Sequence, residues 1–354
     1  MMNYLTRLIG RFSRNIGVDL GTANTLVHVK GKGILLNEPS LIAIDADTRQ
    51  VLAVGNEAKT MYGRTPGSII ANRPLKSGVI ADYDQTLEML KYFIRRVSAS
   101  SGFFPAVCIG IPSGVTEVEE RAVREAAIHA GASEAFTIEE PHAAALGAGL
   151  PVDEANGSMI LDIGGGTSEA AVMSLGGVVA SRSVRTAGDK LDDDILEYMK
   201  KEMGLLIGAK TAEDIKKNIC SAFPLENELK YEAKGRDIVT GLPRSVTVRS
   251  EAVRECCMEH FREIVDTVRL TLEVTPPELA ADIMENGLYM AGGGAYIKGL
   301  NKLISKELSI PVYIANDPLN CVVMGAAIAI EEMDRSPVLK KVLSNSSYRA
   351  DRLS

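Results

Sequence analysis

One sequence pattern occurs twice in this chain of 354 residues and limits its fold more than any other feature. An apolar segment is followed by Asp, an apolar residue, Gly and then Thr, first at 16–22 and again, 143 residues later, at 159–167. A strand that turns back through Gly and Thr points several backbone N–H groups into one concave turn, which suits phosphate oxygens. Glycine is needed there because a Cβ would block the ligand or the positive φ of the turn. The pattern predicts an α/β protein with two related halves that bind phosphate groups.

A third glycine-rich turn, 292–295, follows a predicted strand at 288–290 and precedes a predicted helix, and we expect it to approach a nucleoside. Each repeated motif also places an Asp at its strand end, where a carboxylate can hold the water shell of Mg²⁺. One such hairpin alone would be read as a plain β-turn, but three glycine turns together favour nucleotide binding. Neither a G-x-x-x-x-G-K-[ST] loop nor a strand–GxGxxG–helix stretch with a suitably placed acid occurs, which disfavours P-loop NTPases and Rossmann dehydrogenases.

Composition excludes several other classes of protein. Predicted strands and helices alternate over two runs, which indicates α/β layers in two compact units. The net charge is −7, so we expect no nucleic-acid partner, because nonspecific phosphate binding needs a basic surface. The five cysteines form no CxxC pair, which favours reduced thiols. No segment approaches the roughly 18 to 20 apolar residues of a spanning helix, so we expect a cytoplasmic protein.

The three turns, in this order and spacing, resemble those of the actin/Hsp70/sugar-kinase ATPase superfamily. Within it, the chain resembles the MreB family of bacterial actin-like rod-shape proteins from about residue 16 to residue 330. The segments that carry this resemblance are 19–26, 30–33, 36–40, 63–67, 73–75, 78–82 and 205–208. The resemblance implies a two-domain, actin-like α/β ATPase fold of the duplicated ribonuclease H-like type, with the nucleotide in the interdomain cleft.

This fold divides the chain into five expected parts. They are a membrane-binding amphipathic helix at 1–14, domain I at 15–150 and 316–340 with a small subdomain at about 33–75, domain II at 151–315 with a small subdomain at about 187–248, and a flexible tail at 341–354.

The resemblance also implies where ATP and Mg²⁺ bind. Glu140 would orient the attacking water with help from Thr167, while Asp19 and Asp162 would lie near the metal and reach it through water. One carboxylate suffices because phosphoryl transfer to water mainly needs a positioned water and electrostatic stabilisation. The implied nucleotide contacts are Asp19, Gly21, Thr22, Ala23 and Asn24; Asp162, Gly164, Gly165, Gly166 and Thr167; Gly188; Glu213, Asp214, Ile215 and Lys216 near ribose and adenine; and Gly292, Gly293, Gly294 and Ala295 beside the base.

A structural role is the plainer alternative for Glu140 and for its neighbour Glu139. Glu139 and Glu140 precede Pro141, and acids at the start of a helix commonly oppose its dipole. This explanation suits Glu139, whereas we favour the catalytic role for Glu140. His142 stands where the family pattern has an apolar residue, and a partly buried, hydrogen-bonded side chain is favoured over proton transfer.

Residues 1–14 hold three Arg and no acid, opposite in sign to the chain as a whole. At about 100° per residue, a helix would gather Leu5, Leu8, Ile9 and Phe12 on one side and the arginines on the other. Such a helix lies in the headgroup region of an anionic membrane, although it could also pack on its own domain or remain a disordered leader. Phe103 and Phe104 either begin a buried strand or, as the resemblance implies, form a second apolar contact with the membrane.

The implied function is an ATP-dependent cytoskeletal protein. It would form filaments, as paired antiparallel protofilaments, on the inner face of the cytoplasmic membrane, and would organise cell-wall synthesis with the elongation machinery to set rod shape. Head-to-tail contacts do not close and therefore give filaments, and a filament multiplies weak membrane anchors. The alternatives are an Hsp70-like chaperone ATPase, for which no peptide-binding domain follows residue 333, and a sugar or acetate kinase, in which Glu140 would face a substrate hydroxyl.

Overall fold

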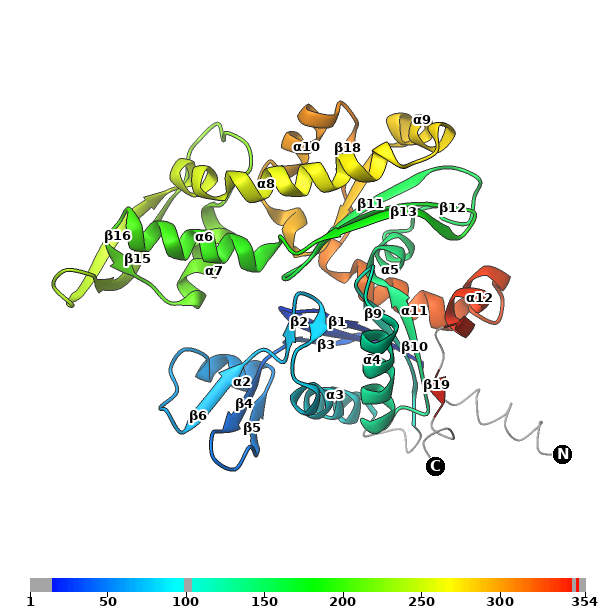
Figure 1. Ribbon diagram of the computed structural model, residues 1–354, viewed down its shortest axis with the longest axis horizontal. Coiled ribbons are helices and arrows are strands. Elements are labelled where there is room, and N and C mark those ends of the chain that lie inside the picture. The colour runs from blue at the N-terminus through cyan, green and yellow to red at the C-terminus, as the bar shows by residue number, and fades with distance from the viewer. Residues whose placement is uncertain (1–14, 99–103, 346–347, 350–354) are drawn as a thin grey trace. The chain divides into compact units, whose positions relative to one another are not determined.

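The computed structural model describes residues 15–98, 104–345 and 348–349 (Figure 1). The chain divides into two compact units. Unit 1 takes its described residues from 1–155, 173–178 and 319–354, and unit 2 consists of 156–172 and 179–318. Each unit is centred on its own β-sheet, as the sequence predicts.

Unit 1 contains a six-stranded sheet in the order β19-β10-β9-β1-β2-β3. β1 pairs antiparallel with β2 through the first glycine turn and parallel with β9, which in turn pairs parallel with β10. The strands are β1 (Ile16–Leu20), β2 (Asn24–Val29), β3 (Gly33–Pro39), β9 (Ala106–Ile111), β10 (Glu134–Glu139) and β19 (Tyr348–Arg349).

Helices cover both faces of this sheet. They are α3 (Tyr83–Ser98), α4 (Glu117–His129), α5 (Glu140–Gly147), α11 (Cys321–Glu332) and α12 (Pro337–Asn345). Ile16 and Val18 of β1 share a buried core with Phe93 of α3. Because side chains alternate along a strand, Gly17 faces the other way, where a Cβ would lie 2.6 Å from the backbone nitrogen of Ala327 in α11. The glycine allows α11 to pack directly on β1.

Helices α5 and α11 also touch each other closely. A Cβ added to Gly325 would lie 1.7 Å from the carbonyl oxygen of Ala143, and one added to Gly147 would lie 1.9 Å from the carbonyl oxygen of Cys321. The two backbones can approach this closely only where both helices present glycine. The crossing fixes α5, which begins with Glu140, against α11.

A smaller sheet, in the order β5-β4-β6, also belongs to unit 1. Together with helix α2 it encloses a small core that includes Ala43, Ala53 and Ala58. The elements are β4 (Ile42–Asp45), β5 (Val51–Val54), α2 (Asn56–Met61) and β6 (Ile69–Asn72), followed by the hairpin of β7 (Leu75–Lys76) and β8 (Val79–Ile80).

The sheet of unit 2 repeats the topology of the first. Its strand order is β13-β12-β11-β17-β18, which corresponds strand for strand to β3-β2-β1-β9-β10, and β11 pairs parallel with β17 as β1 does with β9. The strands are β11 (Ser158–Ile163), β12 (Ser168–Ser174), β13 (Gly177–Val184), β17 (Leu288–Ala291) and β18 (Val312–Ile314). This repetition confirms the duplicated fold predicted from the two motifs.

The helices of unit 2 bury regular apolar stripes. Leu191, Ile195 and Met199 follow one another at four-residue spacing on α6, and this stripe is fully buried. The helices are α6 (Gly188–Lys201), α7 (Ala209–Ile219), α8 (Ser250–Glu273), α9 (Pro277–Asn286) and α10 (Leu300–Leu308). A three-stranded sheet consists of β14 (Leu205–Leu206), β15 (Lys230–Asp237) and β16 (Pro243–Arg249).

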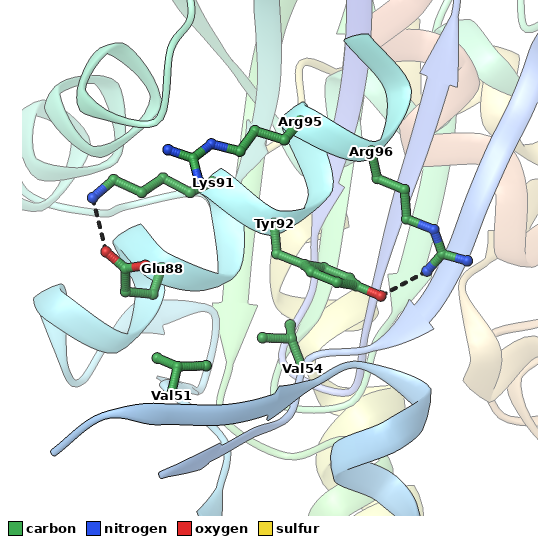
Figure 2. A pocket seen from close by; sticks show the side chains of 7 residues that line it. All are labelled: Val51, Val54, Glu88, Lys91, Tyr92, Arg95 and Arg96. Carbon is green, nitrogen blue, oxygen red and sulfur yellow. Dashed lines mark hydrogen bonds and ion pairs between the residues drawn. The ribbon is translucent and has the colours of Figure 1, made fainter. Parts of the chain in front are cut away.

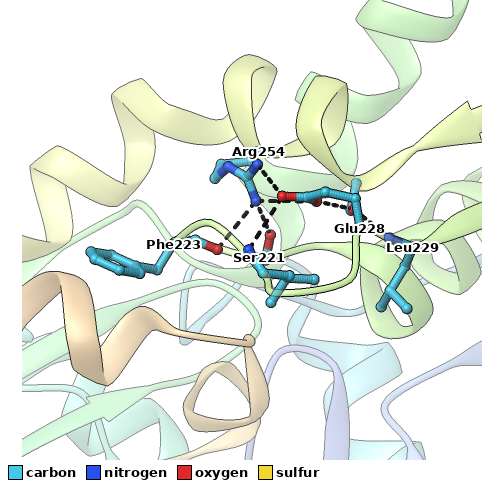
Figure 3. Close-up of polar contacts among 7 residues, drawn as sticks. Ser221, Phe223, Glu228, Leu229 and Arg254 are labelled. Atoms are coloured by element: carbon cyan, nitrogen blue, oxygen red, sulfur yellow. Dashed lines mark hydrogen bonds and ion pairs between the residues drawn. The ribbon is translucent and has the colours of Figure 1, made fainter.

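One side chain of α8 holds the segment between α7 and β15. Figure 3 shows the Arg254 guanidinium, which donates to Glu228 Oε1 at 2.7 Å, Ser221 Oγ at 2.8 Å and the Phe223 carbonyl oxygen at 3.1 Å. Hydrogen bonds from Arg254 and Ser250 lower the pKa of Glu228 to about 2. A single charged cluster therefore fixes a connection that has no regular secondary structure.

Part of the predicted tail has regular secondary structure. Residues 341–354 were expected to be flexible, yet α12 continues to Asn345 and β19 pairs antiparallel with β10. Leu339 and Leu343, one helical turn apart, are buried, and this burial stabilises the helix. The predicted membrane residues Leu5, Leu8, Ile9, Phe12 and Phe103 lie outside the described residues. Among the helices that are described, none is long and apolar enough to cross a membrane.

Candidate nucleotide-binding site

The first glycine turn joins β1 to β2 at the end of the central strand of unit 1. A Cβ on Gly21 would lie 2.7 Å from the carbonyl oxygen of Asn24 and 3.3 Å from Asp19 Oδ1. Only glycine fits this turn, and the Asp19 carboxylate lies directly beside it. The predicted first phosphate turn therefore has the tight geometry that its sequence indicates.

Two residues that the sequence reasoning did not assign hold this turn in place. The Ser40 hydroxyl donates to the carbonyl oxygen of Gly21 at 2.6 Å, and the backbone N–H of Gly78 donates to Thr22 Oγ1 at 2.8 Å. Thr22 is buried, so its hydroxyl supports the turn from inside the protein. The matched segments 36–40 and 78–82 contain Ser40 and Gly78, but nothing in their local pattern indicated these contacts.

The second turn, between β11 and β12, is less tight, because a Cβ on Gly164 would lie 3.5 Å from the carbonyl oxygen of Thr167. The N–H of Gly164 donates to the carbonyl oxygen of Thr167 at 2.9 Å, and Thr167 is buried. Asp162 is also buried, and its Oδ1 has no hydrogen-bond partner within the described chain. Burial raises the pKa of Asp162 to about 7. A buried carboxylate oxygen without a donor fits a metal ion and its water shell, because such an ion supplies the missing charge and donors.

The third turn packs directly on the second. Gly292 has a φ of +75°, and a Cβ there would lie 2.3 Å from the carbonyl oxygen of Ile163 and 2.6 Å from Asp162 Oδ1. A Cβ on Gly294 would lie 2.1 Å from Ile163 Cγ2. Two motifs that are far apart in the sequence thus meet around one carboxylate. Only glycine permits this approach.

Helix α6 begins on the second turn. The backbone N–H groups of Gly188 and Asp189 donate to the carbonyl oxygens of Gly164 and Gly165, at 3.2 and 2.8 Å. These bonds satisfy two of the amides that a helix start otherwise leaves without partners. The predicted contact residue Gly188 is thereby joined to the predicted phosphate turn.

Lys216 of α7 connects the segment that is predicted to contact ribose and adenine to helix α6. Its ammonium donates to the Gly188 carbonyl oxygen at 2.6 Å and to Asp192 Oδ2 at 2.7 Å. Burial, which outweighs the attraction of Lys216, raises the pKa of Asp192 to about 6. Glu213, by contrast, pairs with Lys217 one turn along α7. Asp192 was missed in the sequence because it is one of three consecutive Asp residues on α6, and only one of them faces Lys216.

The two adjacent glutamates of unit 1 have different surroundings. Glu139 caps α5 by position and accepts a hydrogen bond from Ser113 Oγ at 2.9 Å, as a structural acid does. Glu140 is buried, and a Cβ on Gly110 would lie 3.4 Å from its Cγ. Gly110 is the parallel partner of Asp19. Asp19 and Glu140 therefore flank the same end of β9.

His142 is buried, and the expectation that it would be hydrogen-bonded is not met at Nε2, which has no partner in the described structure. Desolvation lowers the pKa of His142 below its usual value, so the imidazole is neutral at pH 7. Phe104 precedes β9 and is 71% exposed, which places it outside the core.

Each unit thus presents glycine turns and a carboxylate at the carboxyl end of its central strand, on matching sheets. This arrangement defines an actin-like nucleotide-binding protein. The chain belongs to the MreB/Mbl protein family, which its sequence matches over residues 13–337. It is 50% identical to the cell shape-determining protein MreB of Escherichia coli (strain K12) over 336 residues, which cover 93% of this chain and 97% of that protein. It is 51% identical to the cell shape-determining protein Mbl of Bacillus cereus over 327 residues, which cover 92% of this chain and 98% of that protein.

Solved structures agree with this assignment. MreB5 of Spiroplasma citri bound to ADP superposes with a TM-score of 0.87 at 42% identity, covering 92% of this chain and 99% of that one. A MamK double helical filament matches with a TM-score of 0.78 at 21% identity, covering 90% of this chain and 99% of that one, and it supports the fold alone. The family and the actin-like fold predicted from the sequence are therefore confirmed.

Proposed function

We propose that this chain is an ATP-hydrolysing cytoskeletal protein that polymerises on the membrane and organises cell-wall synthesis to set rod shape. The observation that carries the proposal is the convergence of two glycine turns on the buried Asp162 in unit 2, matched by the Gly21 turn beside Asp19 in unit 1. The MreB and Mbl relatives are named as cell shape-determining proteins. MreB5 of Spiroplasma citri has been solved with both ADP and AMPPNP.

ATP with Mg²⁺ is the ligand that these residues fit. The backbone amides of 21–24 and 164–167 would bind phosphate oxygens, and Asp19 and Asp162 would hold the metal through its waters. The bound ion would supply positive charge next to the phosphates. Lys216 and Glu213 would contact ribose and adenine, with 292–295 beside the base. The orphaned oxygen of Asp162 supports the metal assignment, because this buried oxygen accepts no hydrogen bond from the described chain.

Hydrolysis would use Glu140 to orient the attacking water, with Thr167 assisting. Two observations support Glu140 over its neighbour. Glu140 is buried whereas Glu139 is only partly buried, and Glu140 lies against Gly110 of β9, the residue that pairs with Asp19 of β1.

Two matched substitutions test this role. Glu140→Ala should bind ATP within about threefold of the wild-type affinity and release phosphate on the order of 10² to 10⁴ times more slowly, the usual worth of a positioned acid or base. Glu139→Ala, the control, should keep turnover within about threefold of wild type. Measured phosphate release that is unchanged in Glu140→Ala refutes the catalytic role.

Assembly is proposed as paired antiparallel protofilaments on an anionic membrane, working with the elongation machinery. The exposed Phe104 supports a membrane contact near the start of β9. Electron microscopy with Mg-ATP and anionic liposomes tests the polymer, which the absence of filaments would refute. Deleting residues 1–14 should abolish co-sedimentation with liposomes and leave nucleotide affinity unchanged. Equal co-sedimentation of the two forms would contradict the role of that segment.

A further inference from the structure

Unit 1 carries a pocket that contains none of the predicted nucleotide residues. It has a volume of about 440 Å³ and lies between helix α3 and strand β5 of the small sheet (Figure 2). This volume falls in the range of protein ligand sites, roughly 300 to 1,000 Å³. The lining residues are Val51, Val54, Glu88, Lys91, Tyr92, Arg95 and Arg96.

The inner wall of the pocket is apolar. Figure 2 shows Val51 and Val54 projecting from their strand toward α3, with the ring of Tyr92 facing them. Val51 is 38% exposed and Tyr92 is partly exposed, whereas Val54 is 5% exposed and belongs to the core of unit 1. An exposed apolar side chain that lines a concavity beside an aromatic ring is available to a ligand. The wall can therefore accept an apolar side chain.

The rim of the pocket is cationic. Lys91 pairs with Glu88 at 2.8 Å on the surface. Such a pair contributes only about 0–1 kcal/mol to stability, so a ligand carboxylate can replace Glu88 as the partner of Lys91. Arg96 is already held by Glu38 and by the Tyr92 hydroxyl. No ion pair or hydrogen bond is found for Arg95 among the described residues. The opening thus offers one cation without a partner and a second in a weak pair.

The helix dipole accounts for part of this pattern, because Arg95 and Arg96 lie in the last turn of α3, where cations are favourable. The dipole does not account for the apolar side chains that the small sheet places in the same pocket as these cations. The combination suits a ligand that has both an apolar group and a carboxylate, whereas inorganic phosphate would leave the valines and the tyrosine ring without a partner.

We propose that this pocket binds an acidic peptide segment of a partner protein. One apolar side chain of the peptide packs on Val51, Val54 and Tyr92, and a neighbouring carboxylate binds Arg95, in the bidentate geometry that guanidinium favours, with Lys91 beside it. Because the lining comes from α3 and from the small sheet, the bound peptide also bridges these two parts of unit 1. The proposal does not depend on nucleotide binding.

The probe is a fluorescein-labelled decapeptide of alternating Glu and Leu, with Gln/Leu and Glu/Ser decapeptides as matched probes, measured by fluorescence anisotropy in nucleotide-free buffer. The full chain should bind the Glu/Leu peptide at least tenfold more tightly than either of the others. Arg95→Glu and Val51→Ser should each weaken that binding about tenfold or more. Arg121→Glu reverses a cation on α4 whose side chain is 64% exposed, and this variant should bind the Glu/Leu peptide as wild type does. Melting temperatures near that of wild type establish that the variants are folded.

Three results would overturn the proposal. The first is no binding of the Glu/Leu peptide, and the second is equal affinity in Arg95→Glu and Arg121→Glu. The third comes from co-sedimentation with phosphatidylglycerol vesicles: if Arg95→Glu loses vesicle binding while peptide binding is retained, the cations face a lipid surface instead. Vesicle binding that is equal in the two charge reversals supports the peptide.

Discussion

Replacing Asp192 by Ala tests how unit 2 connects α7, which we propose contacts ribose and adenine, to α6 and the Gly164 turn. The ammonium of Lys216 lies 2.7 Å from Asp192 Oδ2, and the two side chains are only 14% and 15% exposed. Removing one partner of a buried ion pair typically costs about 3–5 kcal/mol. Because Lys216 keeps its bond to the Gly188 carbonyl oxygen, we expect the lower end of that range, about 3 kcal/mol in the free energy of unfolding.

A matched control lies on the same helix. Glu197 pairs with Lys201 through side chains that are 59% and 66% exposed, so Glu197→Ala should leave the free energy of unfolding close to that of wild type. At about 2–4 °C per kcal/mol for a domain of this size, Asp192→Ala should melt roughly 6–12 °C below wild type. Thermal and urea unfolding of the nucleotide-free protein measure both effects.

A double-mutant cycle with Lys216→Met assigns the loss to the pair. The coupling between the two sites should be about 2 kcal/mol or more, within the range for residues in contact. ADP affinity should also fall in Asp192→Ala, because Lys216 loses the group that orients it. If Asp192→Ala destabilises the protein no more than Glu197→Ala does, the reasoning is wrong. If stability falls and ADP affinity does not, the pair is structural only.

Two further predictions concern a charge cluster and a helix crossing. Hydrogen bonds lower the pKa of Glu228 from 4.5 to about 2, so its stabilising effect is complete above about pH 4.5 and is lost as the pH falls toward 2. At pH 7, Glu228→Gln should therefore unfold at a lower urea concentration than wild type. The difference between the two unfolding midpoints should narrow below pH 4.5, and a difference that stays constant to pH 2 contradicts the assignment. Gly325→Ala places a Cβ 1.7 Å from the Ala143 carbonyl oxygen and should cost about 1–3 kcal/mol or more. Gly67→Ala, whose Cβ meets nothing within 4 Å, should cost less than about 0.5 kcal/mol, and equal melting temperatures for these two variants would show that the crossing is not tight.

Local chemistry made much of the fold predictable. The strands β1, β11 and β17 follow from short apolar segments. The third turn rests on the positive φ that glycine adopts easily at Gly292, whereas Gly21 is required by close packing against Asn24. The start of α5 was also predictable, because Pro141 marks the first turn of a helix, while the catalytic role of Glu140 stays a prediction. The helix that runs into the expected tail was not predicted, because Leu343 stands in a polar stretch and becomes buried only once α12 packs.

The sequence by itself determined the duplicated motif, the turns that suit phosphate and the family, because each rests on residues close together in the chain. Only the tertiary structure showed that Gly292 packs against Asp162, that Ser40 supports the Gly21 turn, and that Asp192 rather than either neighbouring Asp faces Lys216. It also brought α3 against β5 to form the pocket beside Arg95. These contacts join residues that are distant in sequence, and no local spacing rule specifies them. The physical reason is that close packing of whole helices and sheets, not any single segment, decides which side chains meet.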